Sequence, residues 1–205
     1  MPHTSPHLSP IPPQAPPPLT GWPLLRLGFR PFYLLTALLA CISVPVWMAA
    51  FLGYMPLQLP LSGLLWHGHE MLFGFAVGVI AGFLLTAVKA WTGHMTARGP
   101  LLAALVLLWL AGRIAAVCAP YIVFAVVDML FLPAVAVVLL RVLFKSGNTR
   151  NIPLISLLLL MSVANLCFHL TQLNLVDWDP LRPLYAALGL ILMVVSVMTG
   201  RVVPI

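Results

Sequence analysis

Residues 66–88 of the chain read WHGHEMLFGFAVGVIAGFLLTAV, with two histidines and a glutamate ahead of a long apolar segment. An apolar run of about 20 residues is the length that crosses the hydrocarbon core of a bilayer as a helix. The stretch therefore predicts a transmembrane helix over residues 67–88. Ionisable groups at a membrane boundary are costly, so those at the start of this helix are candidates for a functional role.

The composition of the whole chain supports a membrane protein. Of its 205 residues, 62% are hydrophobic and 7% are charged, and the mean hydropathy is +1.08. A soluble domain of this size lacks the interior to hide so much apolar surface. The net charge of +6 comes from basic residues that are scattered singly, which argues against a nucleic-acid partner. The composition predicts an all-α polytopic bundle whose surroundings are the lipid bilayer.

Two parts of the chain differ in composition. Residues 1–25 are rich in proline, which is typical of a disordered or polyproline tail. Residues 26–205 are predicted to form a six-helix transmembrane domain, with turn residues between the helices. Pro45 and Pro133 fall inside spans and are expected to kink them. The six helices are expected near 32–54, 67–88, 100–119, 121–143, 152–173 and 183–200.

Basic residues predict the orientation of this domain. With six spans, Arg182 alone lies at one end of the helices, together with Glu70, Asp177 and Asp179. Because basic residues favour the cytoplasmic side, both termini are predicted to be cytoplasmic. The segment 67–70 then faces the outer compartment, which is the periplasm in a Gram-negative cell. The basic residues at the cytoplasmic end are Arg26, Arg30, Lys89, Arg98, Arg141, Lys145, Arg150 and Arg201.

Two charged residues are predicted to pair inside the membrane. Arg113 lies seven residues before the turn at 120–121, and Asp128 lies seven residues after Tyr121. Antiparallel neighbouring helices therefore bring them to the same depth, where an unpaired charge would cost several kcal/mol. Two interpretations stay open. The pair locks the two helices together, or Arg113 also lies close to an anionic group such as a haem propionate.

The fifth predicted span carries a polar face. Ser162, Asn165, His169 and Gln172 recur at spacings of three, four and three, which places them on one side of a helix. His169 lies within a turn of the outer end, at the level of the two histidines in 66–88. A lone intramembrane histidine is more often a hydrogen-bonded packing residue. The shared depth makes His169 a candidate metal ligand as well.

The second predicted span carries a face of ionisable and small residues. A ladder of small residues there allows close approach to the backbone. Either a tightly packed neighbouring helix fills it, or a flat macrocycle does, bound to His67. His69 points about 200° away from His67 in an α-helix, so the two serve different centres or one is structural. The residues on this face are His67, Glu70, Met71, Gly74, Gly78 and Gly82.

Further roles follow from the chemistry of these side chains. Glu70 is expected to orient an imidazole through its second nitrogen. Copper fits a mixed set of His67 or His69 with the thioether of Met71. His94 lies in the loop at the opposite end and is interpreted as an ordinary interfacial residue.

Six short motifs occur in order along the chain: GFRPF (28–32), WHGHEMLFG (66–74), VIAGFLLTAV (79–88), WTG (91–93), LAGR (110–113) and GRVVP (200–204). Together they resemble the NnrS family of bacterial membrane proteins. The resemblance runs from about Arg26 to the end of the chain. It implies a haem- and copper-containing protein of the bacterial inner (plasma) membrane, linked to nitric oxide metabolism and to tolerance of nitrosative stress. By this resemblance His67 and His69 are the leading ligand candidates, and His169 follows by position.

Two departures from the family stand out. Family members are generally longer, with further spans after the GRVVP segment, so a missing C-terminal half or a second chain is an expected partner. Lys89 stands where the family's version of this turn is expected to have proline.

Other functions remain as alternatives. A cofactor-free transporter would use Pro45 and Pro133 as hinges, with Arg113, Asp128 and Asn165 along a polar path. A half-protein that pairs with another chain would need no chemistry of its own. The sequence contains no GxSxG, P-loop or HExxH motif and no evident carboxylate pair, so it supports no familiar type of enzyme and assigns no particular turnover reaction.

Overall fold

The computed structural model describes residues 21–56 and 59–202, which contain helices and no strand. Two short 3-10 helices, Pro23–Leu25 and Thr149–Asn151, precede α1 and α6. A π-helical segment, η2, lies between α2 and α3. The longer elements are α1 (Phe29–Phe51), α2 (Gly63–His69), η2 (Glu70–Ala76), α3 (Val77–Thr92), α4 (Gly99–Cys118), α5 (Tyr121–Ser146), α6 (Ile152–Gln172) and α7 (Leu181–Val202).

The elements α2, η2 and α3 form one continuous helix, Gly63–Thr92. With these three counted as one, the described residues contain six helices that are long and apolar enough to cross a membrane. The predicted all-α polytopic bundle with six spans is therefore confirmed. The second span begins at residue 63, four residues before the predicted start at 67. The predicted start was placed at the ionisable residues because they were expected to lie at the membrane boundary. In the structure His69 and Glu70 are buried within the bundle, so the helix begins before them.

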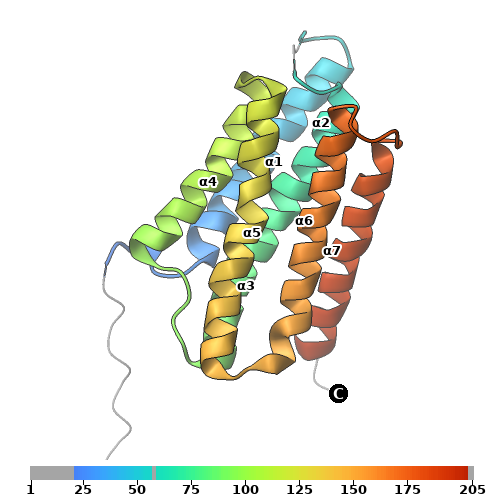
Figure 1. The fold of residues 1–205 in the computed structure, drawn as a ribbon. Coiled ribbons are helices and arrows are strands. Elements are labelled where there is room, and N and C mark those ends of the chain that lie inside the picture. Colours follow the sequence, from blue (N-terminus) through green and yellow to red (C-terminus); the bar gives the residue numbers. More distant parts are fainter. Residues whose placement is uncertain (1–20, 57–58, 203–205) are drawn as a thin grey trace, which may run out of the picture.

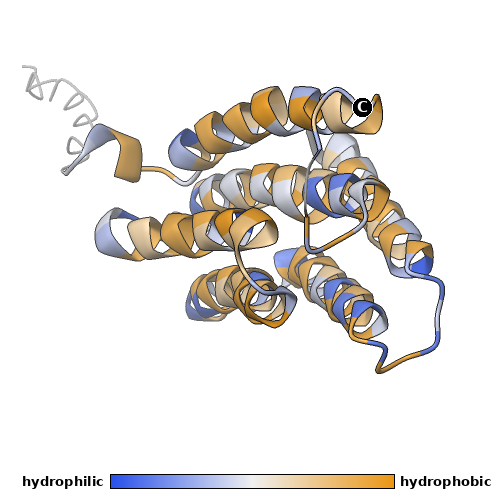
Figure 2. Ribbon diagram, turned by 90° about the horizontal axis from the view of Figure 1, so that it is seen from above, coloured by the Kyte–Doolittle hydropathy of each residue, from blue (hydrophilic) through white to orange (hydrophobic). Residues whose placement is uncertain are grey.

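The helix Gly63–Thr92 lies at the centre of the bundle. Its α3 part packs against α1 and α5, and its η2 part touches α1, α4 and α7. Helices α4, α5, α6 and α7 follow one another as packed antiparallel neighbours (Figure 1). Hydrophobic residues run along the helices, and hydrophilic residues gather at helix ends and connections (Figure 2). This colouring suits a bundle surrounded by lipid and capped by water at both ends.

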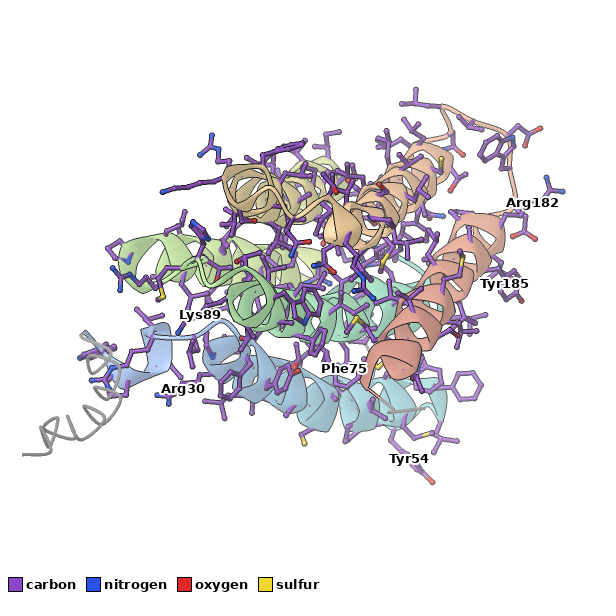
Figure 3. All side chains as sticks on the ribbon, turned by 90° about the horizontal axis from the view of Figure 1, so that it is seen from below. Arg30, Tyr54, Phe75, Lys89, Arg182 and Tyr185 are labelled. Carbon is purple, nitrogen blue, oxygen red and sulfur yellow. The ribbon has the colours of Figure 1, made fainter. Side chains whose placement is uncertain are left out.

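Both ends of the described chain lie at the same end of the bundle (Figure 1). The α4–α5 turn and the α6–α7 connection lie at the opposite end, called here the α4–α5 end. Arg30 and Arg182 lie at the periphery of the bundle (Figure 3). Which end faces the cytoplasm stays a prediction. Residues 1–20 of the predicted proline-rich tail, 1–25, lie outside the described residues, and Pro23–Leu25 forms a 3-10 turn.

The small-residue ladder of the second span is filled by a neighbouring helix. A Cβ at Gly78 would lie 2.5 Å from Thr36 Cγ2, and one at Gly82 would lie 2.8 Å from Phe32 Cβ. Both neighbours belong to α1, so the backbones of α1 and α3 approach closely because these positions lack a side chain. Of the two alternatives for this face, the structure contains the packed helix.

Candidate functional site

A cluster of polar side chains is buried at the α4–α5 end of the bundle. Its members come from α2, η2, α4, α5 and α6, and each is at most 8% exposed. A buried polar group is costly unless it is paired, so the pairing within the cluster decides what it can do. We call this group the polar cluster: His69, Glu70, Arg113, Asp128, Asn165 and His169.

Asp128 lies at the centre of the polar cluster. Its Oδ1 accepts a hydrogen bond from Arg113 Nη2. Its Oδ2 accepts one from Asn165 Nδ2 at 2.6 Å and lies 3.2 Å from His169 Nε2. The Nε2 atom of His69 is 3.3 Å from the same oxygen and 3.0 Å from Asn165 Oδ1. One carboxylate on α5 thus joins α4, α6 and the end of α2.

Arg113 links this carboxylate to a second one. Its Nη1 donates to Glu70 Oε1 at 2.8 Å while Nη2 binds Asp128, so the predicted Arg113–Asp128 ion pair is present. No carboxylate pair was evident from the sequence; the fold places Glu70 and Asp128 on the two amino groups of one guanidinium. Gly74 leaves room for the contact, since a Cβ there would lie 2.7 Å from Arg113 Nη1.

Glu70 therefore has a different main partner from the one expected. It was predicted to orient an imidazole, but its Oε1 atom is 3.6 Å from His69 Nδ1, beyond hydrogen-bond range. The Nδ1 atom of His69 has no hydrogen-bond partner among the described residues. The ion pair with Arg113 dominates because a guanidinium donates short, charge-assisted bonds to carboxylates.

The two imidazoles of the polar cluster converge. The ring centroids of His69 and His169 are 5.4 Å apart. One ligand atom from each of His69, Asp128 and His169 lies within 4.8 Å of the others. The sequence interpretation grouped His69 with His169 only because both lie at the same depth. The structure shows that their rings are close together. The three donors come from three different helices, α2, α5 and α6.

Aromatic rings pack around these donors. The ring of His69 lies 4.9–5.2 Å from the rings of Phe73, Phe124 and Phe168. The hydroxyl of Tyr121 lies 2.8 Å from Nδ1 of His169. A polar partner on the second nitrogen of an imidazole fixes which nitrogen faces inward. Sequence reasoning missed Tyr121. Its place at the first residue of α5, seven residues before Asp128, was the available signal.

His67 has separate surroundings. Its ring stacks on Trp47 of α1, with centroids 3.9 Å apart and an interplanar angle of 13°. The side chain is half-buried, and its Nδ1 atom has no hydrogen-bond partner among the described residues. Met71 is half-buried in η2, and none of the contacts of the polar cluster involves it. The two histidines therefore diverge, as their spacing predicts.

The π-helical segment η2 was not predicted. It buries Glu70, Phe73 and Gly74, and the indole of Trp109 donates to the carbonyl of Gly74 at 3.1 Å. Such wider turns inside α-helices occur frequently at functional sites. Here the segment carries Glu70 and begins directly after His69, so it sets how both side chains enter the bundle.

The residues of the polar cluster fit a small metal ion better than a macrocycle. Two imidazole nitrogens and one carboxylate oxygen form a common donor set for first-row transition metals. With neutral imidazoles, two carboxylates and one guanidinium leave the polar cluster one negative charge in excess. A haem along the glycine face does not fit, because Thr36 and Phe32 occupy that space.

These features define a multi-pass α-helical membrane protein with a buried histidine–carboxylate cluster at one end. A family model described as NnrS protein matches residues 23–205, and the chain belongs to the NnrS family. The matched residues cover all six membrane helices and the whole polar cluster. Searches of curated proteins and of solved structures gave no match.

Proposed function

We propose that this chain is a metal-binding membrane protein of the bacterial nitric oxide response, with copper held by His69, His169 and Asp128. The family is associated with haem, copper and nitric oxide, and the polar cluster supplies a donor set on three helices. The observation that carries the proposal is the convergence of these three donors within 4.8 Å in an enclosed site. Bound copper would supply a redox-active centre for nitric oxide or a related small molecule.

The excess negative charge supports a cation at this point. Arg113 neutralises one of the two carboxylates that it joins, and a buried unpaired charge is strongly unfavourable. A metal cation or a protonated imidazole would balance the charge of the second carboxylate. For the metal, the nitrogen donors would be the two Nε2 atoms that lie 3.3 Å and 3.2 Å from Asp128 Oδ2.

The remaining residues position the donors. Arg113 and Asn165 hold the Asp128 carboxylate from two sides, which fixes the oxygen that faces the imidazoles. Tyr121 holds Nδ1 of His169, leaving Nε2 for ligation. Phe73, Phe124 and Phe168 exclude water, which strengthens every electrostatic interaction inside the site.

His67 stays the predicted haem ligand, on a separate centre from the copper and away from the glycine face, which α1 fills. Its imidazole is half-buried and stacks on Trp47 of α1, away from the contacts of the polar cluster, and its Nδ1 has no hydrogen-bond partner among the described residues. We expect the α4–α5 end to face the periplasm and both termini to face the cytoplasm of the bacterial inner membrane. A second chain is a proposed partner.

Metal analysis of the purified chain tests the proposal, alongside oxidised and reduced absorption spectra. We expect near-stoichiometric copper in the wild type and in His94→Ala, and little copper in His69→Ala. His67→Ala is expected to lose haem absorption and to keep copper. Copper unchanged in His69→Ala would contradict the assignment. A colourless, metal-free protein with activity coupled to an ion gradient would favour the transporter alternative.

A further inference from the structure

A groove runs between α6 and α7, on the opposite side of α6 from the polar cluster's α5. It has a volume of about 650 Å³. Small side chains leave this space, because Ala164 and Cys167 line it on α6, and Ala186 and Gly189 line it on α7. A Cβ at Gly189 would have nothing within 4 Å. The groove is therefore open between two helices that pack against each other elsewhere.

The groove faces the bilayer and has the depth of one leaflet. Leu160, Val163 and Met193 line it and are 51%, 54% and 53% exposed, and in a membrane bundle such residues face lipid. Its lining residues on α7 extend from Arg182 to Met193, roughly 16 Å along the helix. One leaflet, half of a hydrocarbon core of about 30 Å, has a similar depth. The length therefore suits one acyl chain that enters from the α4–α5 end.

The rim of the groove at the α4–α5 end is polar and accessible. Trp178 and Arg182 line the groove there, next to the α6–α7 connection. Trp178 is 51% exposed, and Arg182 is exposed at the periphery of the bundle (Figure 3). The ion pairs between described residues all lie in the polar cluster, so none of them involves Arg182. Tryptophan at the end of a span is typical of the headgroup level, so the guanidinium can meet a lipid headgroup.

Two carboxylates accompany this guanidinium. Asp177 and Asp179 are exposed and stand directly before and after Trp178 in the chain. Asp179 also fixes the start of α7, because its Oδ1 accepts a hydrogen bond from the backbone N–H of Leu181 at 2.9 Å. Its carbonyl accepts one from the backbone N–H of Arg182 at 3.0 Å. The rim thus carries one cation and two anions, so the headgroup that complements it carries both an anion and a cation.

We propose that the α6–α7 groove binds phosphatidylethanolamine, with an acyl chain along the groove, the phosphate on Arg182 and the ammonium beside Asp177 and Asp179. A guanidinium donates paired, charge-assisted hydrogen bonds to a phosphate. A primary ammonium carries three N–H donors for the carboxylates. The headgroup of phosphatidylglycerol has no cation, and that of phosphatidylcholine has no N–H to donate. This site goes beyond the proposed metal centre and does not depend on it.

Native mass spectrometry of the full chain, titrated in detergent with one lipid at a time, tests this site. The probes are phosphatidylethanolamine, phosphatidylglycerol and phosphatidylcholine with the same acyl chains, and we expect the first to bind most tightly. Arg182→Gln should weaken its binding about five- to tenfold by removing the phosphate contact. Asp177→Asn should reduce the preference over phosphatidylglycerol. Arg141→Gln, at an exposed arginine near the opposite end of α5, is the control and should bind like the wild type.

A second pair of variants tests the groove itself. Gly189→Trp should abolish the tight binding by filling the space for the acyl chain. Leu192→Trp is its matched control, because Leu192 is 58% exposed on α7 and does not line the groove. Equal binding by these two variants would overturn the proposal, as would wild-type binding by Arg182→Gln. Tighter binding of phosphatidylglycerol than of phosphatidylethanolamine would also overturn it. Copper content in the same samples separates a failure of this site from a failure of the metal proposal.

Discussion

His67 and His69 stand two residues apart in one helix and have opposite surroundings. His69 is fully buried beside the carboxylate of Asp128 on α5 and the amide of Asn165 on α6. His67 is half-buried and stacks on an indole of α1. The side facing α5 and α6 is thus built for charge and ligation, and the side facing α1 for close apolar packing. One helix presents two different chemistries because successive residues point in different directions.

The largest expected effect comes from removing the centre of the charged side. Asp128→Ala leaves Arg113 with one carboxylate and removes the acceptor shared by Asn165 and His169. Each buried donor left without an acceptor costs about 1–3 kcal/mol, so thermal unfolding in detergent should shift strongly downward. Asp177→Ala, in the exposed α6–α7 connection, is the control and should melt like the wild type. Equal melting of the two variants would refute a structural role for the cluster.

A smaller effect is expected on the packed side. Gly78→Ala places a Cβ 2.5 Å from Thr36 Cγ2 and 3.1 Å from Trp109 Nε1. Overpacking of this kind costs about 1–3 kcal/mol. Gly189→Ala on α7 is the matched control, because nothing lies within 4 Å of its added Cβ. If Gly78→Ala is as stable as Gly189→Ala in thermal unfolding, the close contact of α1 and α3 is not the stabilising feature described here.

The smallest effect on stability should come from Tyr121→Phe. The substitution removes the hydroxyl that holds Nδ1 of His169, at a cost of about 1 kcal/mol. Copper affinity should fall more visibly, by about tenfold or more, as for other second partners of ligating histidines. Competition with a copper chelator measures this change. Tyr185→Phe, at an exposed tyrosine on α7, should keep the wild-type affinity, and an identical loss in both variants would argue against positioning by Tyr121.

Sequence reasoning found the parts of the site that depend on depth. The positions of Arg113 and Asp128 about a short turn predicted their pairing, because adjacent antiparallel helices share depth. The level of His169 matched that of His69 for the same reason. Helical spacing likewise separated His67 from His69.

The other contacts of the site depend on which helices become neighbours. Hydropathy gives the spans and leaves their packing order open, so the contact of Glu70 with Arg113 across η2 and α4 was not predictable. The π-helical segment also has no simple sequence signal. The glycine ladder predicted close approach, and only the fold shows that α1 is the element that approaches.

The most direct test is electron paramagnetic resonance of the Cu²⁺-loaded chain, with attention to the nitrogen hyperfine structure. We expect coupling to two imidazole nitrogens in the wild type and in His67→Ala, and to one in His69→Ala and in His169→Ala. That result would place copper among α2, α5 and α6 and separate it from His67. Loss of a nitrogen in His67→Ala, with an unchanged spectrum in His69→Ala, would contradict the account.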